Sequence, residues 1–463
     1  MAHLMRCLYC GLLQDEPRGI KTCVRCGGEL AFEQPPPARS YVQAQMELDQ
    51  INAPAEQIVD RYLVLTIQTP SQVPDDEAAP TTSGREPMGF TAVLDVSGSM
   101  RGEKIESARE AVRQAVRCLH DGDLLSLVTF ASEVQTVLKP TQVDGRLRQQ
   151  VEDILNRVSA GGQTALCSGL EAGIEAARAR PQETNLVLLL SDGQANVGET
   201  DLEKVGERAL KARQGGVTTS TLGVGSDYNE ALMVEIATQG GGRFYHVLHA
   251  HQITPYVVGE LGEVSALAAR DTALHLILPG GTGLQPFSSA YTVSAQSLVS
   301  LGDIPIDTQL EVVLRLLLPP QPASSRLPIE GTLTYRSPAG NELTTPLNAV
   351  TLRFVAPAAF DRRDGAVVPV VERVLEQMKA RSVLGTVRVA AVSGRAAADE
   401  RARLSIAELR TYASLLGDEV AEELAAQQQR TFVAMAAAPA AAKNAVSRAY
   451  ARHRSTKDFD RKK

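Results

Sequence analysis

Residues 90–104 read FTAVLDVSGSMRGEK, and this stretch decides how the rest of the chain is interpreted. An apolar run ends in Asp95, Ser97 and Ser99, three oxygen-bearing side chains at alternate positions. A continuous apolar run is typical of the buried strands of a parallel sheet. Carboxylate and hydroxyl oxygens suit Mg²⁺ or Mn²⁺ better than zinc. The stretch therefore predicts a cation-binding turn at the carboxyl end of a core strand, which is where α/β sheets bind ligands.

The surrounding residues, 89–250, alternate strands and helices. The apolar runs LLSLVTF (124–130) and LVLLL (186–190) predict further buried strands. Between them lie helical stretches, such as GEKIESAREAVRQAVRCL (102–119), whose apolar residues recur at helical spacing. Repeated strand–helix units predict an α/β fold, a Rossmann-like doubly wound sheet with helices on both faces.

The flanking segments have a different pattern. From residue 255 the apolar residues recur with period two between Gly and Pro turns, which predicts a β-sandwich. Two earlier strands cannot bury their apolar faces alone, so we expect them to join this sandwich. The α/β domain is then inserted in the sandwich or followed by it. The expected organisation is a cysteine module at 1–33, strands at 40–70, the α/β domain at 89–250, the sandwich at 255–357, three helices within 366–450 and a solvated basic tail at 451–463.

Two other strand ends supply oxygen ligands that could complete the cation site. AGGQTAL (160–166) provides Thr164 just before a helix, and Asp192 follows the strand LVLLLS. Taken singly, a Thr in this place is usually a helix N-cap, and Asp-Gly is usually a turn. The carboxyl ends of parallel strands share one edge of a sheet, however, so we expect Thr164 and Asp192 to lie beside Asp95.

Asp95, Ser97, Ser99, Thr164 and Asp192 together resemble the metal-ion-dependent adhesion site of von Willebrand factor type A domains. The wording of 89–250, including DLLSLVTFAS, SDGQANVGET and TLGVGSDYNEALMVEIA, is similar to the bacterial group that resembles calcium-activated chloride channel regulators and inter-alpha-inhibitor heavy chains. The resemblance implies that the first four residues ligate or approach Mg²⁺, Mn²⁺ or Ca²⁺. Asp192 would act directly or through water.

A cation held by two carboxylates and neutral hydroxyls keeps positive charge and an open position, which an acidic side chain of a protein partner can fill. A metal-dependent hydrolase would need a general base, and the nearby loops offer Glu103 and Gln163 but no His. We therefore expect a non-enzymatic interaction scaffold without catalytic residues. The alternatives are a regulatory subunit of an AAA+ ATPase, the hydrolase, or occupation of the open position by an internal carboxylate from the loop at 75–77.

The cysteine module contains Cys7-x₂-Cys10 and Cys23-x₂-Cys26, separated by a short loop. Four thiolates with this spacing predict a tetrahedral Zn²⁺, and the module resembles a zinc ribbon. A segment this short cannot build an apolar core, so the zinc would supply its folding energy. A redox dithiol pair is the alternative.

Composition limits the partners. The chain has 463 residues, 44% of them hydrophobic and 22% charged, with a net charge of −7. These values are typical of a globular protein and argue against nucleic acid as a partner. No apolar run is long enough for a membrane helix, and the N-terminal residues do not resemble a signal peptide. We expect a cytoplasmic protein that binds a protein partner, with self-association as an open alternative.

Overall fold

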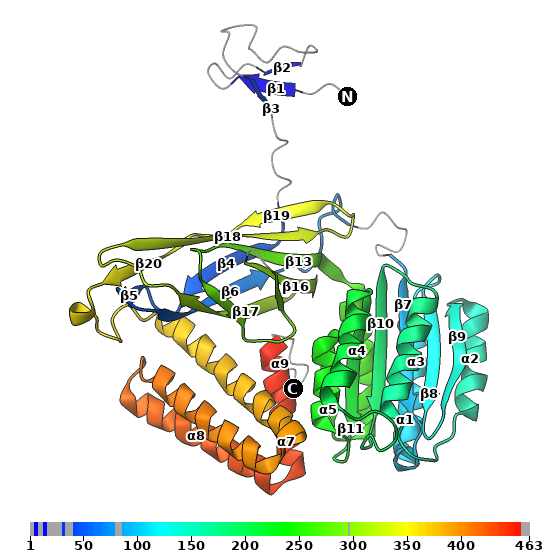
Figure 1. The fold of residues 1–463 in the computed structure, drawn as a ribbon. Coiled ribbons are helices and arrows are strands. Elements are labelled where there is room, and N and C mark those ends of the chain that lie inside the picture. Colours follow the sequence, from blue (N-terminus) through cyan, green and yellow to red (C-terminus); the bar gives the residue numbers. More distant parts are fainter. Residues whose placement is uncertain are drawn as a thin grey trace.

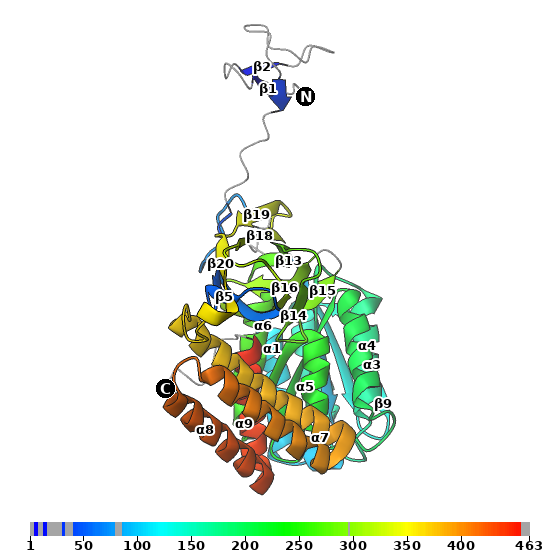
Figure 2. The same ribbon diagram turned by 60° about the vertical axis from the view of Figure 1, so that its left-hand side comes forward.

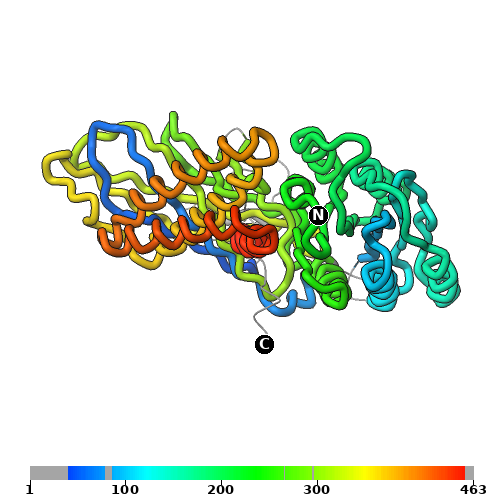
Figure 3. The backbone as a smooth tube through the Cα atoms, turned by 90° about the horizontal axis from the view of Figure 1, so that it is seen from below, coloured from blue at the N-terminus to red at the C-terminus, as the bar shows by residue number. Residues whose placement is uncertain are grey.

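The computed structural model describes residues 4–7, 13–15, 30–32, 40–78, 86–294 and 297–454. Figure 1 shows three units, with strands at the upper left, helices below them and a mixed sheet with helices at the right, and Figure 3 shows the chain from below. We call them the α/β unit (86–266), the two-sheet unit (40–78 with 267–355) and the helical unit (368–454). Near the N-terminus, Leu4–Cys7 (β1), Leu13–Asp15 (β2) and Leu30–Phe32 (β3) form a small antiparallel sheet with β1 in the middle.

The α/β unit has one sheet of six strands in the order β12-β11-β10-β7-β8-β9. All neighbours are parallel except β9, which pairs antiparallel at the edge. The chain first builds outward from β7 to β9 and then returns to build from β10 to β12, so the order reverses between β7 and β10. The strands are Met88–Asp95 (β7), Leu124–Phe130 (β8), Val134–Gln142 (β9), Thr184–Ser191 (β10), Val217–Val224 (β11) and Gly241–Val247 (β12).

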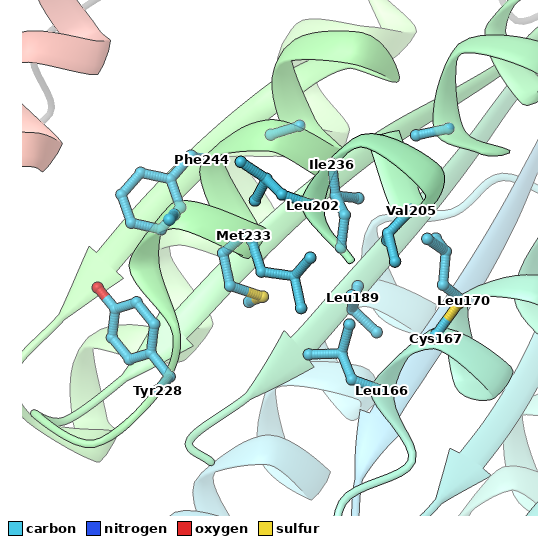
Figure 4. Packing of buried hydrophobic residues seen from close by; sticks show 14 of the residues in the cluster. Leu166, Cys167, Leu170, Leu189, Leu202, Val205, Tyr228, Met233, Ile236 and Phe244 are labelled. Carbon is cyan, nitrogen blue, oxygen red and sulfur yellow. The ribbon is translucent and has the colours of Figure 1, made fainter. Parts of the chain in front are cut away.

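Helices cover both faces of this sheet, because the central strands are buried on both sides. In β7, Val93 faces one apolar core while Phe90 and Leu94 face the other. One face carries Leu166–Ala179 (α3), Leu202–Gln214 (α4) and Glu230–Gln239 (α5), whose packing is drawn in Figure 4. The other carries Glu103–Cys118 (α1), Gly145–Arg157 (α2) and Ile253–Ser265 (α6). Short 3₁₀ turns span Gly98–Met100 (η1) and Ala250–Gln252 (η2).

Helix α6 corrects the predicted end of the α/β unit at residue 250. Ile253, Val257 and Leu261 lie in the same core as α1, so the unit extends through this last helix. Only Ala266 separates α6 from the next strand, which begins at Leu267. Pro255, Gly259 and Gly262 weaken the helical pattern of this segment, because proline and glycine have the lowest helix propensities.

The two-sheet unit consists of two β-sheets that face each other across one apolar core. The larger follows the order β15-β16-β13-β18-β20-β5, with β19 also paired to β18, and the smaller is β14-β17-β6-β4. The strands are Gln43–Leu48 (β4), Asn52–Pro54 (β5), Val59–Gln68 (β6), Leu267–Ile277 (β13), Gly283–Pro286 (β14), Thr292–Ser294 (β15), Leu298–Pro305 (β16), Gln309–Leu318 (β17), Arg326–Arg336 (β18), Glu342–Pro346 (β19) and Val350–Val355 (β20).

Residues on either side of the α/β unit belong to this two-sheet unit. Strand β6 pairs along its whole length with β17, from Gln68↔Gln309 to Val59↔Leu318. The chain leaves and re-enters at neighbouring points, because Asp307 N–H donates to the Pro70 carbonyl (2.7 Å) and Ile306 N–H donates to the Ala266 carbonyl (2.9 Å). The α/β unit is therefore an insertion between β6 and β13.

Polar contacts join the two-sheet unit to the amino ends of the α/β strands. Arg270 of β13 donates to Glu183 just before β10 (2.6 Å), and Arg213 at the end of α4 donates to the Ala290 carbonyl (2.7 Å). The carboxyl ends of the α/β strands lie at the opposite edge of the same sheet. That edge consequently faces away from the two-sheet unit.

The helical unit comprises Val368–Ala413 (α7), Asp418–Ala437 (α8) and Pro439–Arg454 (α9), preceded by a turn at Pro357–Ala359 (η3). Gly394 has a φ of 81°, a left-handed value that breaks α7 into two arms. Pro439 begins a separate helix. Residues 368–454 thus contain four helical segments instead of the three predicted. Figure 2 shows these helices beside the α/β unit, and α7 also packs on the outer face of β6 and β17.

Helix α9 joins the helical unit to the α/β unit. The Lys443 side chain is almost fully buried, and its Nζ donates to the Tyr228 carbonyl (2.6 Å) and to the Glu230 carboxylate (2.8 Å). Tyr450 donates from its hydroxyl to the Gly242 carbonyl (2.9 Å). Within the described part of the chain, no helix has both the length and the apolar composition needed to cross a membrane.

Candidate metal site at the carboxyl edge of the α/β sheet

The turn after β7 brings the first three predicted residues together. Asp95 ends the strand and its side chain has no exposed surface. Its Oδ1 accepts a hydrogen bond from the Ser97 backbone N–H (2.8 Å), which turns the chain sharply into η1. The Ser97 and Ser99 hydroxyl oxygens then lie 3.0 Å apart. The alternate spacing read from the sequence thus places both hydroxyls on one side of the turn.

A second loop, residues 160–164, is fastened to this turn by backbone hydrogen bonds. Gly161 N–H donates to the Val96 carbonyl (2.7 Å), and Gly98 N–H donates to the Gly162 carbonyl (3.0 Å). These bonds hold Thr164, which is buried, next to the first motif. The predicted neighbourhood of Thr164 and Asp95 therefore rests on main-chain contacts between two loops at one edge of the sheet.

The third segment follows β10, the strand next to β7 at the point where the strand order reverses. Asp192 is completely buried, and its Oδ1 accepts a hydrogen bond from the Ser99 hydroxyl (2.7 Å). A Cβ atom on the following Gly193 would lie 3.0 Å from the Thr164 hydroxyl oxygen and 3.5 Å from that of Ser99. The structure thus brings Ser99, Thr164 and Asp192 together beside Gly193, which leaves space between the Thr164 and Ser99 hydroxyls. Ser97 joins them through its contact with Ser99, and Asp95 accepts from Ser191, next to Asp192.

The two carboxylates at this edge are buried and carry an electrostatic cost. Burial raises the pKa of Asp95, and hydrogen bonds from Ser191 and Ser97 partly oppose that rise, while the nearby Asp192 adds to it. A buried charge needs a counter-charge or hydrogen bonds. Asp192 has a counter-charge within the protein, since Lys104 Nζ forms an ion pair with its Oδ2. Asp95 has hydrogen bonds alone among the contacts of the described residues.

The donor set fits a hard divalent cation. It combines two carboxylates with three hydroxyls, all oxygen, which are ligands of the kind that Mg²⁺ and Mn²⁺ accept. In the described ranges no three His, Cys, Asp or Glu side chains form a metal-holding group. A cation at this edge would therefore depend on the Ser and Thr hydroxyls as well as on Asp95 and Asp192.

Three neighbours of the site were not predicted from the sequence. Ser191 donates to Asp95, Asn196 accepts from the Thr164 backbone N–H (2.9 Å), and Lys104 pairs with Asp192. For Lys104, the sequence does contain an indication, which is its position in a helix. It is the second residue of α1, and a cation in the first turn of a helix opposes the helix dipole unless an anion is near.

The acidic loop at 75–77 lies elsewhere. Glu77 is buried against the two-sheet unit, where its carboxylate accepts from the Asn341 side chain (3.0 Å) and its carbonyl accepts from Ala339 N–H (3.0 Å). Asp75 and Asp76 are exposed. Glu77 is thus occupied by contacts of its own, and the hypothesis that it fills the metal's open position is not supported.

A groove of about 580 Å³ opens beside the candidate site. Val96, Gly161 and Gly162 form its inner end, and these residues also hold the metal-site loops together. The outer walls come from β8, β9, the turn between them with Ser132 and Glu133, and the end of α2 with Arg157. The candidate metal site is therefore continuous with a mixed polar and apolar surface large enough for several side chains.

The zinc ligands are a separate matter. Cys7 is the last residue of β1, whereas Cys10, Cys23 and Cys26 lie outside the described residues. The tetrahedral zinc site stays a prediction.

Residues 91–256 match the family model described as the von Willebrand factor type A domain, which confirms the predicted class of α/β fold. The match covers less than half of the chain. YfbK from Escherichia coli (strain K12) is 30% identical over 183 residues, which are 39% of this chain and 32% of that protein. Inter-alpha-trypsin inhibitor heavy chain H1 from Mesocricetus auratus is 28% identical over 193 residues, 39% of this chain and 21% of the heavy chain.

The chain thus spans a third or less of these two relatives. A solved structure described as von Willebrand factor type A from Catenulispora acidiphila superposes with a TM-score of 0.62 at 17% identity, and the match covers 90% of this chain and 98% of that one. The similarity at this identity concerns the fold. It extends beyond the α/β unit to most of the chain.

Proposed function

We propose that the protein is a metal-dependent interaction scaffold. Asp95, Ser97, Ser99, Thr164 and Asp192 hold Mg²⁺ or Mn²⁺, and an acidic side chain of a protein partner completes the coordination of the metal. The bound cation supplies a Lewis-acidic, positively charged contact point. The protein's own groups orient it: Ser97 and Ser99 offer their hydroxyls, and the loop of Thr164 is fixed to the turn after β7 by main-chain hydrogen bonds.

One observation carries the proposal. Five oxygen-bearing residues from three separate segments lie at one edge of the sheet, where the strand order reverses, and short contacts through Ser99, Ser191 and Gly193 connect them. A buried pair of carboxylates without a catalytic or structural need is costly, and a divalent cation would offset that cost. The side chains in hydrogen-bond contact with the five are Ser191, Lys104 and Asn196 among the described residues, so we assign no general base and no enzymatic step.

The position of the site also supports a partner-binding role. The carboxyl edge of the sheet faces away from the two-sheet unit, whose contacts are with the opposite edge. The groove beside the site provides surface for the partner's neighbouring residues. The helical unit reaches this edge after β11, where Lys443 contacts Tyr228 and Glu230. A partner would therefore approach the metal from the side of the groove, along β8, β9 and α2.

The test is capture of partners from native lysate by the purified full chain, in Mg²⁺ and in EDTA. We expect a protein that is retained by the wild type in Mg²⁺ and lost in EDTA. Ser99→Ala should lose the same protein, and because Ser99 is exposed, this change should leave the fold intact. Asp95→Ala is a second variant. Asp121→Ala is the matched control, since Asp121 is an exposed acid of the same unit, paired with Arg148.

Calorimetric titration with Mn²⁺ on the same proteins separates the metal from the partner. Loss of Mn²⁺ binding in Ser99→Ala and Asp95→Ala, but not in Asp121→Ala, is the expected result. Equal Mn²⁺ affinity in all four proteins would refute the metal site. If the captured protein is an AAA+ ATPase, the scaffold would be a regulatory subunit of that enzyme.

We further propose that Cys7, Cys10, Cys23 and Cys26 hold one Zn²⁺ as a structural element and that the protein acts in the cytosol, where paired thiolates remain reduced. The zinc content of the purified chain, measured by mass spectrometry, should fall to zero in Cys23→Ser. Zinc that remains in Cys23→Ser would show that the metal is bound elsewhere. A wild-type protein without zinc would refute the zinc site.

A further inference from the structure

Lys104 is placed where it bears directly on the candidate metal site. It is the second residue of α1, and its Nζ forms an ion pair with Asp192 Oδ2. The lysine side chain is 30% exposed, whereas the carboxylate is fully buried. Gly225, the residue after β11, also lies near the lysine: a Cβ atom added to this glycine would be 3.7 Å from Lys104 Nζ. The ammonium group is therefore held between the start of α1 and the loop after β11.

The two carboxylate oxygens of Asp192 contact different groups. Oδ1 accepts from Ser99, one of the candidate metal ligands, at 2.7 Å, while Oδ2 contacts Lys104. A cation approaching Ser99 would meet the Oδ1 side of the carboxylate. The lysine can consequently keep its ion pair when the site is loaded, because the two positive charges use opposite oxygens of one carboxylate.

The charges of the site then add up in an informative way. With these three groups in their charged forms, Asp95 and Asp192 contribute −2 and Lys104 contributes +1, so the metal-free site has a formal net charge of −1. A divalent cation brings the loaded site to +1. Without Lys104, the loaded site would be neutral and the empty one would carry −2. Lys104 therefore changes the net charge that the loaded site presents to an anion from zero to +1, in addition to the open position of the cation itself.

We infer that Lys104 adjusts two affinities of the site. It weakens the binding of the divalent cation, and it strengthens the binding of a carboxylate to the loaded site. This inference rests on the proposed function, and it names the ligand class as a carboxylate on a protein partner. The physical basis is Coulombic. Two unit charges a few ångströms apart at a partly buried site interact strongly enough for at least about a tenfold effect on an equilibrium constant.

The first experiment titrates Mn²⁺ alone into the full chain by calorimetry. Lys104→Gln should bind Mn²⁺ at least about tenfold more tightly than the wild type, because the repulsive charge has gone. Lys104→Arg keeps the charge and should stay within a fewfold of the wild type. Lys211→Gln is the matched control, an exposed lysine of the same unit that pairs with Glu207, and should not change the affinity.

The second experiment follows water-proton relaxation of the Mn²⁺-loaded proteins while acetate is added. Acetate stands in for the partner's carboxylate and displaces metal-bound water. Lys104→Gln should require a concentration at least about tenfold higher than the wild type for the same displacement. Opposite effects on Mn²⁺ and on acetate are the signature of the inference, since a merely structural role for Lys104 would weaken both.

The outcomes separate the inference from the proposed function. If Lys104→Gln binds Mn²⁺ equally or more weakly while Asp95→Ala loses it, the inference is wrong and the metal site stands. If Asp95→Ala binds as well as the wild type, the metal site itself fails. Should Lys104→Gln be unstable without metal, thermal unfolding decides: the inference requires a larger Mn²⁺-induced rise in melting temperature than in the wild type, and an equal or smaller rise overturns it.

Discussion

The substitution Gly193→Ala tests the geometry of the candidate site with the addition of one methyl group. Gly193 does not have a left-handed φ, so alanine can adopt its backbone conformation. The new Cβ would stand 3.0 Å from the Thr164 hydroxyl oxygen and 3.5 Å from that of Ser99. The first contact is tighter than ordinary packing, and Thr164 would have to move by a few tenths of an ångström.

A displacement of that size matters to a metal more than to the fold. Mg²⁺ needs oxygen ligands at about 2.0–2.1 Å in near-ideal octahedral geometry. Losing one oxygen contact to a charged centre costs about 1.5–3 kcal/mol, so the dissociation constant should rise about tenfold to a hundredfold. Exchange of a compatible glycine for alanine changes the stability of the fold by only about 0.4–1 kcal/mol.

The assay is calorimetric titration with Mg²⁺ and Mn²⁺, with thermal unfolding of the metal-free protein alongside. Gly161→Ala is the matched control, because its Cβ would meet only the flexible end of Arg101 at 3.9 Å. We expect weaker binding in Gly193→Ala alone, with similar melting temperatures for all three proteins. Wild-type affinity in Gly193→Ala would refute the idea that the metal lies between the Thr164 and Ser99 hydroxyls.

Three further predictions concern stability. Lys443→Met removes the buried partner of Glu230 and should speed amide hydrogen exchange across α9 about 30-fold, for a loss of about 2 kcal/mol, while exchange in the core strands of the sheet is unchanged. Burial raises the pKa of Asp49 to about 6, above its unfolded value of 3.8. The wild type should therefore lose about 2 kcal/mol of stability relative to Asp49→Asn as the pH rises from 4 to 7, and parallel urea-unfolding profiles for the two proteins would contradict this. Gly173→Ala puts a Cβ 2.4 Å from a Val93 methyl and should lower the free energy of unfolding by about 1–3 kcal/mol, which calorimetry can measure.

The sequence predicted the features that depend on local pattern. The apolar run before Asp95 indicated a buried central strand, and β7 is buried at every position. The residue type at Asp192 became informative through a general rule, that parallel strands end at one edge. The rule was wrong for Thr164, which follows no strand and lies in the loop between α2 and α3. The structure brings both residues to that edge, beside Ser99.

Features that depend on contacts between distant segments were beyond the sequence pattern. The place of Lys104 in the first turn of α1 suggests a nearby anion, but only the fold identifies that anion as Asp192. Lys443 lies in an Ala-rich stretch that was predicted to be helical, but its pattern does not indicate the burial of this lysine against Tyr228 in another unit. Burial of a charged side chain in these cases follows from which units meet, and hydrophobic periodicity does not encode that.

The adjacent exit and entry points of the α/β unit have a consequence for how such a chain can be built. The carbonyls of Pro70 and Ala266 accept hydrogen bonds from the backbone N–H groups of Asp307 and Ile306, respectively, which are neighbours in the chain. The strands of the two-sheet unit would keep their order and pairing if the inserted stretch were exchanged for a short turn. The α/β unit is thus a cassette in a host domain. A gene encoding the host could accept, lose or exchange the binding cassette in a single event without re-routing any strand.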